Sequence, residues 1–124
     1  MTYLSPRLVP SLLIRDFDET RAFYEMLGFT VSGQYPEGEE PDWIEMSCDG
    51  VTLQFFAEAP VGLPGAPMMS GTFYFYPDSV EAMAMELRGK VDFVWGPEVM
   101  PYGMREFGIC DPNGYLLAFT ELAE

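Results

Sequence analysis

The sequence contains no histidine, and this absence is its most restrictive feature. Without histidine the chain cannot supply a Ser-His or Cys-His catalytic pair, an HExxH zinc-binding helix or a two-histidine, one-carboxylate iron site. Basic residues are also scarce, since 6 Lys and Arg stand against 20 Asp and Glu, for a formal net charge of -14. Because a polyanionic surface repels phosphate and anionic lipid and attracts cations, we expect no nucleic-acid or membrane partner.

Long apolar runs and paired cysteine motifs are missing as well. The apolar-rich run at residues 8–14 is interrupted by Pro10 and Ser11, so we expect neither a signal peptide nor a membrane-spanning helix. Cys48 and Cys110 form no CxxC motif. This pattern is typical of small buried residues in a reducing cytoplasm, although a reactive or paired thiol stays open. The sequence therefore predicts a cytoplasmic protein.

The 124 residues are 48% hydrophobic and 15% aromatic, which excludes intrinsic disorder. A chain of this length folds as one domain, here residues 1–124, and buries enough surface without metal or disulfide staples.

An internal repeat organises the chain. Two helix starts, Asp16-Phe-Asp-Glu19 and Asp78-Ser-Val-Glu81, share an Asp cap and lie 62 residues apart. Cys48-Asp49 and Cys110-Asp111 match at the same offset, whereas strands 51–56 and 115–120 match at an offset of 64. We predict an α+β fold of two βαβββ units, about 7–57 and 71–121, joined by a Pro/Gly-rich linker at 58–70.

The expected elements follow the same order in both units. Helices are predicted at 16–27 and 78–87, and strands at 8–14, 29–33, 43–48, 51–57, 72–76, 91–95, 104–110 and 115–121. Period-two alternation places Gln54 and Phe56 on one face of their strand, and Tyr74 and Tyr76 on the corresponding face of theirs. The phase of strand 104–110 is not fixed by its pattern.

Two segments carry a family resemblance. LLIRDFDETRAFYEMLGF at 12–29 and PYGMREFGICDPNGYLLAF at 101–119 resemble the vicinal oxygen chelate superfamily of glyoxalases, extradiol dioxygenases and bleomycin resistance proteins. The resemblance implies a cupped mixed sheet and an intertwined homodimer. Metal enzymes of this family place their ligands at positions that hold Val9, Gln54, Thr72 and Ala118 here, and among these Gln54 alone could coordinate a metal. The resemblance is therefore to the metal-free bleomycin resistance branch, with no metal and no cofactor.

The function implied is a metal-independent binding protein that sequesters a cationic or aromatic antibiotic-like ligand in an aromatic-lined crevice. The alternative is a lyase, isomerase or dioxygenase-like enzyme acting on an unknown small molecule, for which no catalytic residue is assigned because no candidate group pairs with a base. The expected ligand contacts are Trp43, Gln54, Phe56, Tyr74, Tyr76, Tyr102, Arg105 and Phe107.

Simpler roles stay open for these residues. The aromatic side chains could pack the sheet, and Arg105 with Glu106 could form an ion pair. The acidic loop at 37–40 is either solvated or attracts cations.

Overall fold

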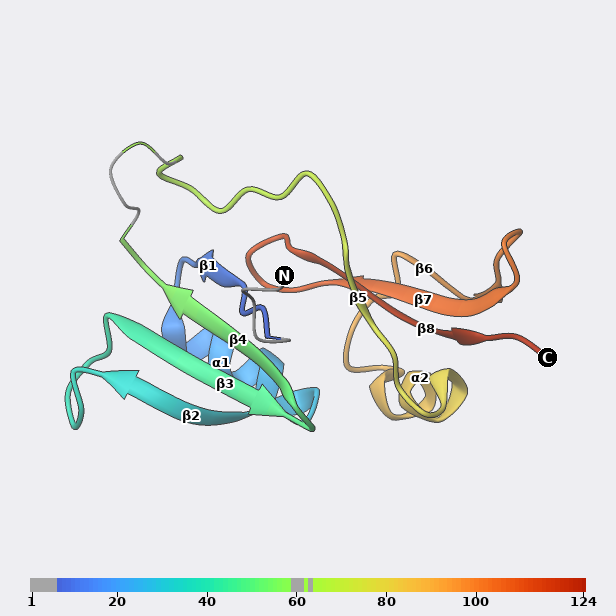
Figure 1. The fold of residues 1–124 in the computed structure, drawn as a ribbon, viewed down its shortest axis with the longest axis horizontal. Helices are drawn as coiled ribbons and strands as arrows, with labels where there is room; N and C mark the ends of the chain where they lie inside the picture. Colours follow the sequence, from blue (N-terminus) through green and yellow to red (C-terminus); the bar gives the residue numbers. More distant parts are fainter. Residues whose placement is uncertain (1–6, 59–61, 63) are drawn as a thin grey trace, which may run out of the picture. The chain divides into compact units, whose positions relative to one another are not determined.

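The chain forms two compact units with the same helices and strands in the same order. The computed structural model describes residues 7–58, 62 and 64–124, and the units are Met1–Pro67 and Met68–Glu124 (Figure 1). Each unit contains one helix and a four-stranded sheet in the order strand, helix, strand, strand, strand. The predicted α+β fold of two βαβββ units is confirmed, and the boundary between the units lies within the predicted linker. No helix in the described part of the chain is long and apolar enough to cross a membrane.

The first unit builds its sheet in the order β1-β4-β3-β2. Its elements are β1 (Ser11–Leu13), α1 (Phe17–Met26), β2 (Thr30–Tyr35), β3 (Trp43–Cys48) and β4 (Val51–Phe56). Strand β1 runs parallel to β4, and the other neighbours are antiparallel. The β3–β4 hairpin turns at Asp49 and Gly50, which both have positive φ angles of 48° and 84°, as a tight two-residue turn requires.

The second unit repeats this arrangement in the order β5-β8-β7-β6. Its elements are β5 (Phe73–Phe75), α2 (Val80–Leu87), β6 (Trp95–Val99), β7 (Met104–Cys110) and β8 (Leu116–Leu122). The turn between β7 and β8 is held by Asp111, whose Oδ1 accepts hydrogen bonds from the backbone N–H groups of Asn113 (2.8 Å) and Tyr115 (2.9 Å). This DPNG turn fixes the register of the hairpin that carries most of the second core.

The two helices begin at different residues of the shared motif. Asp16 caps α1, since its Oδ1 accepts from the backbone N–H of Glu19 at 2.8 Å. The cap of α2 is Ser79, whose Oγ accepts from the N–H of Ala82 at 3.1 Å, so the prediction that Asp78 is the cap is wrong. A serine hydroxyl one residue later makes the same bond that an aspartate makes in the first unit.

The repeat is therefore offset by 63 residues at the helix caps and at the third strands. Phe55 and Phe119 are equivalent in the two units, and they pair with Ile44 and Phe107 respectively. Ile44 of β3 therefore corresponds to Phe107 of β7, at an offset of 63. The predicted equivalence of Cys48 and Cys110 is wrong, because it places residues from opposite faces of the two sheets together. The Cys-Asp pair at the end of each strand suggests an equivalence that the alternation of side chains between the two faces of the sheet contradicts.

Strand β6 lies four residues beyond its predicted start and includes a proline. The register shifts between Trp95 and Glu98, where Gly96 and Pro97 interrupt the ladder. Because β6 is an edge strand, it tolerates at this irregularity a proline that a central strand would exclude. The predicted strand 91–95 therefore overlaps β6 at Trp95 alone.

Each unit buries its own aromatic core between helix and sheet. In the first unit Tyr24 of α1 is fully buried and packs against Phe55 of β4, with ring centroids 4.9 Å apart. In the second unit Phe119 stacks on both Phe75 and Phe107, each at 5.0 Å and an interplanar angle of 16°. One face of each sheet therefore packs against the helix of its own unit.

Candidate functional site

The first sheet has a far face, directed away from α1. Along β3 and β4 buried residues alternate with half-buried residues that point the other way. The buried set, which includes Phe55 against α1, is Ile44, Met46, Leu53 and Phe55. The far face of unit 1 consists of Trp43, Glu45, Ser47, Thr52, Gln54 and Phe56. Gln54 and Phe56 therefore lie on the side that the alternation of their strand predicts.

A chain of hydrogen bonds crosses this far face. Glu45 accepts from Ser32 Oγ at 3.0 Å and from Gln54 Nε2 at 3.2 Å. Ser32 and Ser47 lie 2.9 Å apart, and Ser47 and Thr52 lie 3.4 Å apart. Because Ser32 donates its single hydroxyl proton to Glu45, Ser47 donates to Ser32, and Thr52 donates to Ser47. The face thus presents one carboxylate whose orientation is set by neighbouring strands.

Trp43 lies close to Glu45 and to the backbone of β2. A Cβ at Gly33 of β2 would stand 3.3 Å from the Trp43 ring, so the glycine allows the indole to approach the backbone closely. Gly33 also pairs with Glu45 across the ladder. The first unit therefore places an aromatic ring and a carboxylate next to each other.

The far face of unit 2 is centred on a buried carboxylate. The residues of β7 and β8 that point away from α2 include Glu106, Gly108, Cys110, Ala118 and Thr120. Glu106 is 1% exposed and accepts hydrogen bonds from the Tyr102 hydroxyl, 2.8 Å from both carboxylate oxygens, and from Trp95 Nε1 at 3.0 Å. Desolvation, followed by the hydrogen bond and the negative charge of Glu106, raises the pKa of Tyr102 well above its usual value of about 10.

Trp95 is pressed against the second sheet as Trp43 is against the first. A Cβ at Gly108 of β7 would overlap several carbons of the Trp95 ring, so this position requires glycine. The indole N–H then reaches Glu106 two residues along the same strand. Each unit thus has a tryptophan over a glycine and next to a glutamate on its far face.

The predicted site residues divide between the two faces. Trp43, Gln54 and Phe56 lie on the far face of unit 1, and Tyr74 pairs with Ala118 of the far face of unit 2. The three tyrosines among the predicted site residues are the exposed members of this set, namely Tyr74 (48%), Tyr76 (72%) and Tyr102 (58%).

Arg105 and Phe107, the other two predicted ligand contacts, lie on the helix side of the second sheet. Arg105 Nη1 bonds Glu81 Oε1 of α2 at 3.1 Å, and Phe107 is fully buried against Phe119. Arg105 forms no ion pair with Glu106, because the Glu106 side chain points to the other face of the sheet.

Sequence reasoning missed Trp95 and left Glu106 without an orientation. In the sequence, Trp95 is followed directly by Gly96 and Pro97, and this pattern indicates a bulged edge strand. The signal for Glu106 was a tyrosine four residues earlier, within reach of its carboxylate.

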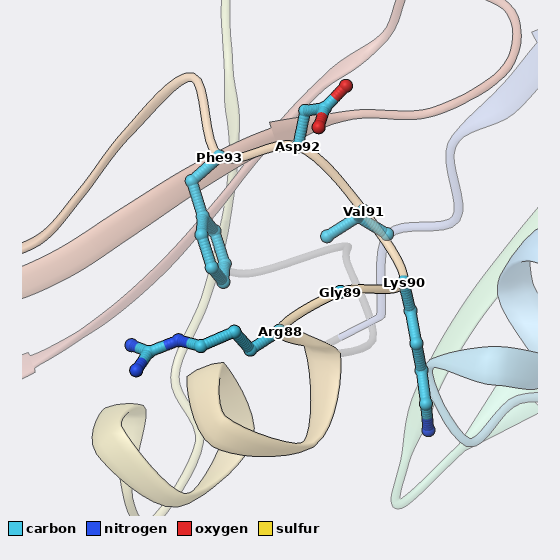
Figure 2. A pocket seen from close by; sticks show the side chains of 6 residues that line it. All are labelled: Arg88, Gly89, Lys90, Val91, Asp92 and Phe93. Atoms are coloured by element: carbon cyan, nitrogen blue, oxygen red, sulfur yellow. The ribbon is translucent and has the colours of Figure 1, made fainter.

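Two surface cavities of the second unit are not lined by a tryptophan. One, of about 410 Å³, is lined by residues 88–93 just after α2. Figure 2 shows the Arg88 and Lys90 side chains pointing away from each other, so their charges do not converge on one ligand. The other, of about 460 Å³, is lined by the free and exposed Cys110 together with Met69, Ser70, Gly71, Thr72, Gly114 and Leu116.

The positions that hold metal in related enzymes do not offer a suitable ligand set. Val9 and Thr72 precede their strands, and within the strands Gln54 pairs with Ser11 and Ala118 with Tyr74. These pairs supply an amide and hydroxyls, but no imidazole, thiolate or carboxylate. Across residues 7–58, 62 and 64–124, no three His, Cys, Asp or Glu side chains are grouped closely enough to hold a metal ion.

The sequence and the fold both match known proteins. Residues 7–119 match the family model described as Glyoxalase/Bleomycin resistance protein/Dioxygenase superfamily. A bleomycin resistance protein from Klebsiella pneumoniae is 27% identical over 128 residues, covering 95% of this chain and 94% of that protein.

Solved structures of the same fold include both binding proteins and enzymes. TnmS3, an antibiotic binding protein from Streptomyces sp. CB03234, has a TM-score of 0.78 at 23% identity, covering 99% of this chain and 100% of its own. Lactoylglutathione lyase from Agrobacterium tumefaciens has a TM-score of 0.73 at 20% identity, covering 97% and 96%. At these identities the likeness concerns the fold, and the function has to be argued from the far faces.

Proposed function

This chain belongs to the Glyoxalase/Bleomycin resistance protein/Dioxygenase superfamily, and we propose that within it the chain is a metal-independent binding protein for a cationic or aromatic antibiotic-like ligand. The observation that carries the proposal is the pairing of a tryptophan with a glutamate on the far face of each unit. A flat ring gains from stacking on an indole, and a positive charge gains from both the indole face and the carboxylate.

The charge of the whole chain supports a cationic ligand. A formal net charge of -14 attracts cations over long distances and raises their rate of association. The curated relative from Klebsiella pneumoniae, which spans nearly the same length, is a bleomycin resistance protein. An enzyme of the metal-dependent kind would need ligands that the Ser11–Gln54 and Tyr74–Ala118 pairs do not provide. We therefore favour sequestration of the ligand over its chemical conversion.

Titration against a panel of bleomycin-type drugs and planar cationic antibiotics tests this proposal. Trp43→Ala removes the ring that lies over Gly33, and we expect it to weaken binding by about 1–2 kcal/mol, or roughly five- to thirtyfold. Arg105→Ala is the matched control, because Arg105 contacts Glu81 on the helix side and should leave the affinity within about twofold. Wild-type protein that binds no member of the panel would refute the proposed function.

We also propose that the protein acts as a homodimer. Each four-stranded sheet has open edges, β1 and β2 in the first unit and β5 and β6 in the second, and open edges favour pairing with another chain. Sedimentation at micromolar concentration should give twice the 14.0 kDa of one chain, and a single species at 14.0 kDa would exclude the dimer.

A further inference from the structure

The far face of unit 2 holds a buried carboxylate with neutral partners. Among the described residues the donors to Glu106 are the Tyr102 hydroxyl and the Trp95 indole N–H, at 2.8 and 3.0 Å. Arg105, the next residue in sequence, lies on the other face and pairs with Glu81. A carboxylate that is removed from water needs a cation or a full set of donors to offset its desolvation. Two donors leave about half of the acceptor capacity of Glu106 unused.

Thr120 provides a second and independent observation on the same face. It is 2% exposed, and its Oγ1 is buried without a hydrogen-bond partner among the residues that the structure describes. Thr120 is paired with Glu106 across the β7–β8 ladder, so their Cβ atoms lie roughly 4.5–5.5 Å apart on the same face. A buried hydroxyl without a partner is destabilising, which singles out this position as one that an external group would complete.

We propose that Glu106 and Thr120 together anchor a primary ammonium group of the ligand. This inference rests on the proposed binding function and names the chemical group that the second unit recognises. A primary ammonium carries three N–H donors on one compact charge, so it can bond one carboxylate oxygen and the Thr120 hydroxyl at once. A guanidinium is less suitable, because it prefers two free carboxylate oxygens, and Oε2 of Glu106 already accepts from Trp95.

Tyr102 covers this anchor and has to yield to the ligand. It stands on the turn between β6 and β7 and is 58% exposed, while its hydroxyl shares one proton between both oxygens of Glu106. An arriving ammonium takes over one oxygen, and the hydroxyl keeps the other. The phenol ring stays beside the bound charge, where its face adds a favourable contact.

Two matched probes test the anchor: 1-naphthylmethylamine, which is positively charged at pH 7, and 1-naphthylmethanol, which has the same ring and no charge. We expect the wild-type protein to bind the amine at least tenfold more tightly than the alcohol. Glu106→Gln should lower the affinity for the amine at least tenfold and leave that for the alcohol within twofold. Glu121→Gln is the control, since it makes the same change of charge at the residue that pairs with Arg105 on the helix side of the sheet.

Thr120→Val provides a second variant that tests the anchor without removing a charge. It removes the hydroxyl at nearly constant volume, so the protein should unfold at the same or a higher temperature. The affinity for the amine should nevertheless fall three- to tenfold. A merely structural role of Thr120 would leave the affinity unchanged.

The results separate the anchor from the proposed function. If the wild type binds both probes equally, or if Glu106→Gln and Thr120→Val bind the amine as the wild type does, the anchor is refuted and the binding function stands. If the wild type binds neither probe, the anchor is refuted for ammonium groups, and the antibiotic panel decides the binding function by its own titration.

Discussion

Replacing Phe107 with alanine should unfold the second unit far more easily. Phe107 is fully buried and stacks on Phe119 at 5.0 Å, while Phe93 meets it edge-on at 5.2 Å. Truncation of such a phenylalanine costs about 3–5 kcal/mol of unfolding free energy, since it removes the transfer gain and leaves a cavity. With an unfolding entropy of about 2.1 cal/mol/K per residue, a cooperative transition of the chain would shift to lower temperature by about 12–19 °C.

Thermal and urea denaturation followed by circular dichroism measure this loss. Tyr76→Ala is the matched control, because Tyr76 is aromatic but 72% exposed, and its midpoint should stay within about 2 °C of the wild type. Phe107→Leu should fall between the two and keep the affinity for ligand, since Phe107 faces α2. The reasoning fails if Phe107→Ala unfolds within about 3 °C of the wild type, or if Phe107→Leu selectively loses ligand binding.

Three further outcomes are expected. Gly108→Ala should displace the Trp95 indole and lower the free energy of unfolding by about 1–3 kcal/mol, with a red-shifted Trp95 emission in a Trp43→Phe background. Gly33→Ala should cost less, because its Cβ would stand 3.3 Å from the Trp43 ring. Equal effects of the two substitutions would contradict the placement of the two rings. Glu106→Gln should lower the pKa of Tyr102, measured by ultraviolet titration, and an unchanged titration would disprove the contact. The wild-type protein should lose stability above about pH 10, because folded Tyr102 keeps a proton that the unfolded chain loses, and Glu106→Gln should make this loss smaller. Exposed Cys110 should react with a thiol reagent before Cys48, because burial, followed by the charge of Asp49, raises the pKa of Cys48. Mass spectrometry gives the order of reaction, and the reverse order would contradict this prediction.

Alternation along β4 was sufficient to orient Gln54 and Phe56, because apolar Leu53 and Phe55 mark the core face without ambiguity. Strand β7 could not be oriented in this way. Arg105 and Glu106 are adjacent charged residues, and the one that is buried is Glu106. A buried carboxylate contradicts hydrophobic patterning and is explained by donors, Tyr102 and Trp95, whose proximity only the fold reveals.

The helix caps and β6 show how local signals compete. Asp78 and Ser79 are both good caps, and the sequence alone favoured the residue type already seen at Asp16. Pro97 is a strong strand-breaking signal, yet at the bulge of an edge strand its missing N–H removes no ladder bond. The general order of elements was predictable because it depends on many residues, whereas these boundaries depend on one residue each.

Titration of metal-stripped protein with the antibiotic panel, in the presence of a chelator, tests the central claim most directly. The account predicts saturable binding of at least one cationic planar member, with the same affinity before and after metal removal and weaker binding by Trp43→Ala. The account is contradicted if no member binds, or if binding disappears with the chelator and returns when a divalent metal is added.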